Sequence, residues 1–244
     1  MTLPHIFLLG STGRTGRLLL TEALSRGHTV TALARDPASL QALVDELSGY
    51  QRKLLNISKG TPTSQSDLEA ALGSALASTT KPITIISTLG QTRKSGSPFA
   101  APTSPPLYMT QSITSLLAAI GTLPAQSRSR IEKLVIMSMF GAGSSYGNLH
   151  CLIKPVMKYS AMAQTVEDHD ALDALVRGQS EVPWVMVRPA MLKDGEPKAA
   201  VIREDDGRGE GWMPSSVTTG TVVTFMLDAV VSRKFDGKTP VLCN

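Results

Sequence analysis

Two spacings of hydrophobic residues alternate along the chain, short apolar runs and segments in which apolar positions recur every three or four residues. The first spacing is typical of buried strands and the second of amphipathic helices. Ile6–Leu9 predicts a strand, the leucine-rich segment that stops at Gly27 predicts a helix, and His28–Ala34 predicts a second strand.

The same alternation continues to the end of the chain. Further strands are predicted at Lys53–Ile57, Ile83–Ser87, Leu134–Ser138, Trp184–Val187, Ala200–Ile202 and Val241–Leu242. Helices are predicted at 36–47, 66–77 (Ser66 and Glu69 having capping-box spacing), 107–120, 157–176 and 216–230, with a turn at Gly207–Gly211. Strands joined by helices predict an α/β fold, a Rossmann-like doubly wound parallel sheet, whose ligands bind at the carboxyl edge between the first and fourth strands.

Composition places the chain among globular proteins, with 42% hydrophobic and 18% charged residues over 244 positions. No apolar stretch approaches the length of a membrane span, and no basic segment precedes the first apolar run, so we expect a cytoplasmic protein that binds no membrane. Cys151 and Cys243 have neither CxxC spacing nor nearby ligand-spaced histidines, which predicts no metal site.

Charge is distributed unevenly. The first 165 residues carry 15 Lys and Arg against 7 Asp and Glu, a net charge of +8, while the last 79 carry 9 against 13, a net charge of −4. A positive segment favours an anionic partner. Because no block of five or six like charges occurs, we expect a small anion and no nucleic acid.

A glycine turn at the first strand is the strongest motif. Its glycines, Gly10, Gly13 and Gly16, follow a predicted strand and open a predicted helix, the context in which such a turn holds a dinucleotide pyrophosphate. A tight turn without a ligand is the alternative interpretation. The predicted phosphate contacts are Gly10, Ser11, Thr12, Gly13, Arg14, Thr15 and Gly16.

The residue that follows the second strand indicates which dinucleotide the chain binds, NAD(H) or NADP(H). An NAD enzyme places an acidic residue there, whereas this chain has Arg35. A guanidinium forks onto a 2′-phosphate, so NADP(H) is favoured. The alternative is an exposed arginine paired with Asp36, although Asp36 also suits a helix cap.

These residues, together with Ile86–Gly90, Thr165–His169, Trp184–Pro189 and Asp206–Gly209, resemble the atypical short-chain dehydrogenase/reductases. The similarity is to the NAD(P)H-binding, NmrA-like branch and especially to the biliverdin-IXβ reductase/flavin reductase group. It implies NADPH-dependent reduction of a planar conjugated acceptor such as a flavin, quinone or enone. It also implies a single domain over 1–244, with 1–150 mainly holding the cofactor and 151–244 forming a small substrate-side lobe.

The resemblance assigns individual positions as well. Asn56 and Ile57 are expected near the adenine, and Ser138 and His169 beside the nicotinamide as the catalytic candidates. The expected contacts to the ribose and the rest of the cofactor are Ser87, Thr88, Leu89, Gly90 and Pro189, with Ser138. Tyr146, Met139 and Phe140, in and before the loop Gly141–Gly147, are the substrate candidates.

The standard acid of short-chain dehydrogenases, a Tyr-x-x-x-Lys pair, does not occur in the sequence. Four positions after the tyrosines stand Leu54, Ser112, His150 and Ala163. Hydride transfer would then take its proton from solvent or another side chain. The alternatives are an NADP(H)-sensing NmrA-like regulator without activity, and a non-redox isomerase or cyclase.

Several candidates have structural interpretations too. Ser138 would cap backbone at a strand end, and His169 would sit at a helix border bonded to a carboxylate. Glu167, Asp168, Asp170 and Asp173 are expected chiefly on a solvated helix face. The loop Gln91–Pro106 either closes over the cofactor or is a mobile surface loop. We expect a monomer or homodimer that binds a small-molecule substrate.

Overall fold

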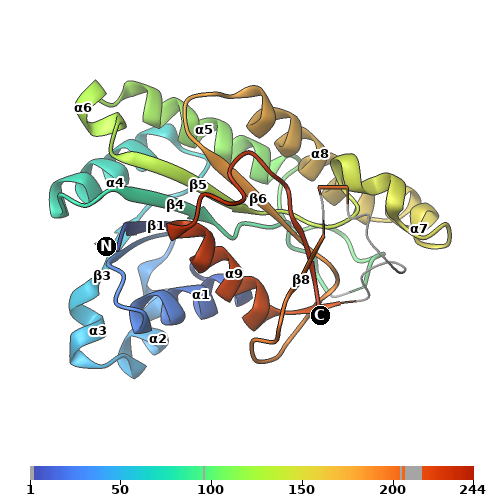
Figure 1. Cartoon of the computed structure of the whole chain (residues 1–244), viewed down its shortest axis with the longest axis horizontal. Helices are drawn as coiled ribbons and strands as arrows, with labels where there is room; N and C mark the ends of the chain where they lie inside the picture. Colours follow the sequence, from blue (N-terminus) through green and yellow to red (C-terminus); the bar gives the residue numbers. More distant parts are fainter. Residues whose placement is uncertain (1–2, 96, 204, 207–215) are drawn as a thin grey trace.

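The computed structural model describes residues 3–95, 97–203, 205–206 and 216–244. Its centre is an eight-stranded sheet of order β3-β2-β1-β4-β5-β6-β10-β8, in which every pairing is parallel except that of β10 with β8 (Figure 1). The strands of the sheet are β1 (His5–Leu9), β2 (Val30–Ala34), β3 (Leu55–Lys59), β4 (Ile83–Ser87), β5 (Ile131–Met137), β6 (Trp184–Pro189), β8 (Val201–Arg203) and β10 (Val241–Cys243). This topology confirms the predicted Rossmann-like α/β fold, with its direction of winding reversed between β1 and β4.

Helices cover both faces of the sheet (Figure 1). One apolar core joins the sheet to α1 (Arg14–Ser25) and α9 (Thr219–Val231). A second core joins the opposite face to α4 (Gln65–Ser78), α5 (Tyr108–Thr122) and α8 (Met162–Gly178). The remaining elements are η1 (Pro37–Leu40), α2 (Gln41–Glu46), α3 (Gly49–Leu54), α6 (Ala125–Arg128), η2 (Gly143–Asn148), α7 (Ile153–Tyr159), and the strand pair β7 (Leu192–Lys193) and β9 (Val217–Thr218).

The third strand begins two residues later than the sequence pattern predicts. Ser48 and Gln51 form a capping box that starts α3, so Lys53 and Leu54 belong to a helix. The next helix also differs at its start, because Ser64 and not Ser66 accepts the hydrogen bond from the Asp67 N–H.

The long helix predicted over 157–176 is wrong, since the structure has α7 and α8 in its place. Ser160 leaves the helical conformation and ends α7, and its hydroxyl accepts a hydrogen bond from the Met162 N–H at 3.1 Å just before α8, whose N-cap is Ala161. The last predicted helix starts later than expected because Thr218 caps it through the Thr221 N–H. The turn predicted at Gly207–Gly211 lies outside the described residues.

Candidate functional site

The glycine turn between β1 and α1 is closely packed. Gly10 has φ +85°, a conformation that side chains disfavour, and a Cβ on Gly16 would lie 2.0 Å from the Gly10 carbonyl oxygen. The Thr88 hydroxyl, just after β4, donates to the Leu9 and Gly10 carbonyls at 3.1 and 3.3 Å. These contacts fix the turn at the carboxyl edge, where the sheet reverses its winding.

The N-terminus of α1 is suited to an anion. Its N-cap is Gly13, no side chain accepts from its first N–H groups, and no acidic residue stands in its first turn. Uncapped N–H groups and the helix dipole together favour a negatively charged ligand. The turn therefore fits the pyrophosphate of a dinucleotide.

A cleft with a volume of about 180 Å³ opens over this turn. The sequence-predicted residues that line it are Gly10, Thr12, Gly13, Arg35, Thr88, Leu89 and Gly90. Its other lining residues include Pro62 and Tyr108, which the sequence did not single out, and Thr92, Thr103, Ser104 and Pro105 of the loop Gln91–Pro106, for which contact with the cofactor was one of the two interpretations. No spacing signal marks those residues, because their position depends on how the segment after β4 folds back.

Arg35 stands at the rim of this cleft with its charge available. It is exposed, and within the described residues it makes no ion pair. The Asp36 carboxylate accepts from the Ala38 N–H at 3.1 Å and caps η1, so the alternative pairing of the two residues is not formed. Burial raises the pKa of the half-buried Tyr108 phenol, and the nearby Arg35 guanidinium opposes that shift.

Other predicted cofactor residues have different surroundings. Arg14 pairs with Asp194 at 3.4 Å, both side chains being largely exposed. Ser11 is buried and its hydroxyl donates to the Leu33 carbonyl at 3.3 Å, and Thr15 and Ser87 are also buried beside the cleft-lining residues.

Asn56 and Ile57 do not reach the cleft. They pair with Thr31 and Ala32 inside β3, away from the carboxyl end of that strand. The two-residue shift of β3 is the physical reason, because it leaves the chain beyond Lys59 to approach the cleft through Pro62.

The loop Gln91–Pro106 folds back on itself as a short hairpin. Thr103 N donates to the Thr92 carbonyl at 2.8 Å and Lys94 N to the Ala101 carbonyl at 3.1 Å. Gln164 of α8 then donates to Gln91 Oε1 at 3.0 Å. The structure therefore places the two ends of this loop side by side, with Thr92, Thr103 and Ser104 lining the cleft.

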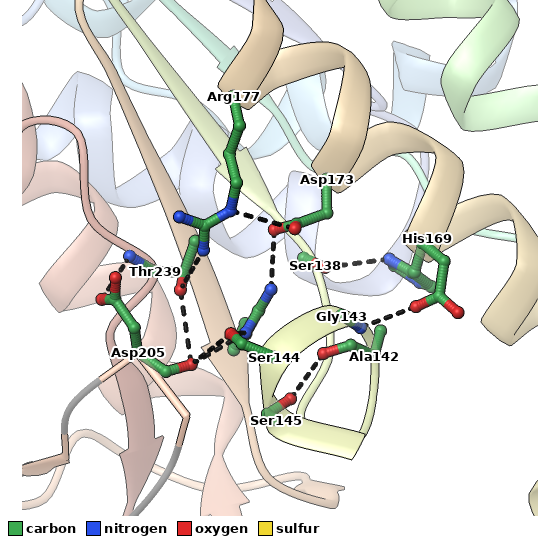
Figure 2. Close-up of polar contacts among 12 residues, drawn as sticks. Ser138, Ala142, Gly143, Ser144, Ser145, His169, Asp173, Arg177, Asp205 and Thr239 are labelled. Atoms are coloured by element: carbon green, nitrogen blue, oxygen red, sulfur yellow. Dashed lines mark hydrogen bonds and ion pairs between the residues drawn. The ribbon is translucent and has the colours of Figure 1, made fainter. Parts of the chain in front are cut away.

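Ser138 and His169 meet at the carboxyl edge, as Figure 2 shows: Ser138 Oγ and His169 Nδ1 form a hydrogen bond of 3.0 Å. Ser138 follows β5, and its backbone N–H donates to the Val187 carbonyl of β6. Burial lowers the pKa of His169 to about 4, with the Arg188 charge acting in the same direction and Asp168 against it. The imidazole is therefore neutral at pH 7.

Asp168 is fully buried, which corrects its assignment to a solvated face. Its carboxylate accepts hydrogen bonds from the Met109 and Thr110 N–H groups, both at 2.9 Å, and from Gln91 Nε2 at 3.0 Å. It thereby caps α5, whose own N-cap residue provides no side-chain hydrogen bond. One carboxylate ties together the His169 helix, the hairpin and the cleft wall.

Arg188, on β6, is a second buried charge near the site. Its Nη2 lies 2.7 Å from Asp173 Oδ1, and its Nη1 donates to Ser144 Oγ and the Asp205 carbonyl, both at 2.8 Å. Asp173 also pairs with Arg177 (Figure 2). Its side chain is only 13% exposed, which corrects its assignment to a solvated face, because the carboxylate is turned toward the buried Arg188 guanidinium. This network holds the segment after β5 against α8.

That segment carries the predicted substrate residues. Gly143 has φ +54°, its N–H donates to Asp170 Oδ1 at 2.6 Å, and a Cβ there would lie 2.6 Å from Arg188 Nη2. Phe140 belongs to an apolar cluster against which Met139 and Tyr146 pack, so the structure brings the three together. Pro189 ends β6 beside them, its carbonyl accepting from Phe140 N at 2.9 Å.

The chain belongs to the NAD(P)H-binding family, whose sequence profile matches residues 10–233. This match confirms the family resemblance. A search of curated protein sequences finds no match.

Solved structures share the fold at low identity. ChuY, an anaerobillin reductase from Escherichia coli O157:H7, is 16% identical with a TM-score of 0.69, over 98% of this chain and 96% of its own. A short-chain dehydrogenase/reductase from Veillonella parvula in complex with NADP is 14% identical with a TM-score of 0.68, over 100% and 95%. The oxidoreductase ylbE from Lactococcus lactis is 16% identical with a TM-score of 0.68, over 98% and 90%. At these identities the comparison establishes the fold alone.

Across the described ranges, the structure has no helix long and apolar enough to span a bilayer.

Proposed function

We propose that the protein is an NADPH-dependent reductase that transfers hydride to a conjugated small molecule such as a flavin, quinone or enone. The observation that carries the cofactor assignment is Arg35, a cation without an ion-pair partner in the described structure, at the rim of a cleft whose floor is the uncapped N-terminus of α1. The NADP-bound fold neighbour supports the choice of NADP(H).

Different groups of residues along the carboxyl edge would bind different parts of the cofactor. Gly10–Gly16 would hold the pyrophosphate, Arg35 the 2′-phosphate, and Thr88–Gly90 the ribose. Ser138 lies two strands farther along the same edge, roughly 10 Å from the turn at the usual strand spacing. An extended dinucleotide spans such a distance and ends at Ser138 and His169.

NADPH supplies a hydride when bound, and the acceptor needs one proton to complete its reduction. His169 is neutral at pH 7, since the pKa is lowered to about 4, and its Nδ1 is engaged by Ser138. We therefore assign the proton to solvent, with the Ser138–His169 pair orienting the reacting groups. A conjugated acceptor suits this arrangement because it spreads the developing negative charge without a strong acid beside it.

The cofactor assignment is tested by Arg35→Ala. The variant should bind NADPH about ten- to a hundredfold more weakly, the loss expected for a charge-assisted hydrogen bond, while its affinity for NADH changes less than twofold. Isothermal titration with each nucleotide measures both values. The control is Arg233→Ala. Arg233 lies beyond the end of α9, and this variant should bind both nucleotides with wild-type affinity. Equal losses for the two nucleotides would show that Arg35 does not contact the 2′-phosphate.

The reaction itself is tested by NADPH oxidation, followed at its absorbance band, with a quinone, a flavin and an enone as acceptors. Turnover of at least one is expected. NADPH binding without turnover of any acceptor would instead support the sensing function, which the missing Tyr-x-x-x-Lys pair also allows.

A further inference from the structure

A second hydroxyl lies near the Ser138–His169 pair, on the buried face of α8. Thr165 stands one helical turn before His169, and the two side chains are 8% and 5% exposed. Residues four apart on a helix lie on the same face, with Cβ atoms about 5–6 Å apart. Val166, next to Thr165, packs against the apolar cluster of Phe140 and Met157.

The Thr165 hydroxyl has no hydrogen-bond partner among the described residues, and its oxygen is not sealed from solvent as the unpaired hydroxyl oxygen of Thr84 is. Buried helical hydroxyls usually donate to the carbonyl four residues earlier, as the Ser112 hydroxyl does to Tyr108 at 2.7 Å. The Thr165 hydroxyl, which makes no bond to its helix backbone and remains open to solvent, is therefore available to a molecule bound at the carboxyl edge.

The direction of α8 places Thr165 at the carboxyl edge of the sheet, where the substrate would bind. The helix follows β5 and leads back to the start of β6, so its first turns lie over the carboxyl edge and Thr165 lies farther out than His169. Side chains on a helix lean toward its N-terminus, which directs the His169 ring toward the turn of Thr165. With Nδ1 bonded to Ser138, the Nε2 atom of His169 also lacks a partner within the described structure.

We propose that Thr165 contacts the acceptor, its hydroxyl donating a hydrogen bond to a carbonyl oxygen of the conjugated molecule beside His169. This inference rests on the proposed reductase function and narrows its substrates to flat conjugated carbonyl compounds. The apolar cluster with Met139 and Tyr146 supplies the surface against which a flat ring would pack. Thr165 binds and orients the acceptor and does not transfer a proton.

The test compares Thr165→Val, which keeps the shape and removes the hydroxyl, with Thr165→Ser, which restores it. The full chain, saturated with NADP⁺, is titrated calorimetrically with 2-methyl-1,4-naphthoquinone and with FMN, and kcat/KM for each acceptor is measured with NADPH. Thr165→Val should weaken acceptor binding and lower kcat/KM about five- to tenfold, the value of one neutral hydrogen bond. Thr165→Ser should stay within twofold of the wild type, and NADPH affinity should not change.

Thr84→Val is the matched control. Thr84 is another buried threonine whose hydroxyl has no partner, but it lies inside β4 between Ile6 and Lys133. The Thr84→Val variant should bind and reduce both acceptors as the wild type does. Unchanged acceptor binding by Thr165→Val, or a loss confined to NADPH, would overturn the inference.

Two further outcomes separate this inference from the proposed function. If acceptors bind in a Thr165-dependent manner without being reduced, the contact stands and the reductase function fails. If the wild-type NADP⁺ complex binds neither acceptor, both proposals fail together.

Discussion

At the scale of the residue, Gly16 shows how one missing side chain shapes the cofactor turn. Its Cβ position is filled by the Gly10 carbonyl oxygen at 2.0 Å, so Gly16→Ala must displace the turn. We expect at least tenfold weaker NADPH binding and a lower melting temperature. Calorimetric titration and thermal unfolding measure the two effects.

Gly73 provides the control for that substitution. It is an exposed residue inside α4, and a Cβ added there would meet nothing within 4 Å. Gly73→Ala should stabilise the protein by about 0.5–1 kcal/mol, as helix propensity dictates, and leave NADPH binding unchanged. Wild-type NADPH affinity in Gly16→Ala would show that the turn does not hold the cofactor.

Single residues were predictable where their role depends on nearby sequence. The glycine turn and Arg35 each follow a strand whose apolar pattern is evident, and the structure places both at one cleft. Asp168 was assigned to a solvated face because its partners, Met109 and Thr110, are more than fifty residues away in the chain. No pattern in the neighbouring sequence indicates hydrogen bonds between residues so far apart in the chain.

At the scale of the element, Asp168 supports two structures at once, the N-terminus of α5 and the hairpin over 91–106. Asp168→Asn replaces one acceptor oxygen by a donor that would face the N–H groups it now binds. We expect a loss of about 2–4 kcal/mol in the free energy of unfolding, the combined value of a helix cap and buried hydrogen bonds.

Urea unfolding measures that loss, with Glu167→Gln, an exposed neighbour on the same helix, as the control. The control should remain within about 0.5 kcal/mol of the wild type. If Asp168→Asn were as stable as this control, the Asp168 carboxylate would not stabilise the N-terminus of α5.

The helices and strands themselves were largely predictable, but their boundaries were not always so. The division between α7 and α8 falls at Ser160, whose backbone leaves the helical conformation inside a segment with a continuous apolar pattern. The spacing of apolar residues indicates which side chains face the core. It does not indicate where a hydroxyl interrupts the backbone hydrogen bonds of a helix.

At the scale of the whole molecule, one buried ion pair joins parts of the chain that are far apart in sequence. Arg188 of β6 contacts Asp173 of α8, Ser144 of η2 and the carbonyl of Asp205. Burial lowers the pKa of Arg188, and Asp173 opposes that shift. The site therefore depends on a charge that is costly to bury and is stabilised by its partner.

This dependence predicts strongly unequal effects of single and double substitutions. Asp173→Leu leaves the Arg188 charge buried without its carboxylate and should cost about 3–5 kcal/mol in the free energy of unfolding, whereas Asp173→Leu with Arg188→Met should recover at least half of that loss. Glu22→Gln, which breaks the more exposed pair with Arg26, should cost less than about 1 kcal/mol. Urea unfolding of the wild type and these three variants measures the losses. A double variant no more stable than Asp173→Leu would mean that the unpaired Arg188 charge is not what destabilises the single variant, while recovery shows that the stability of this edge of the sheet depends on the pairing of the two charges.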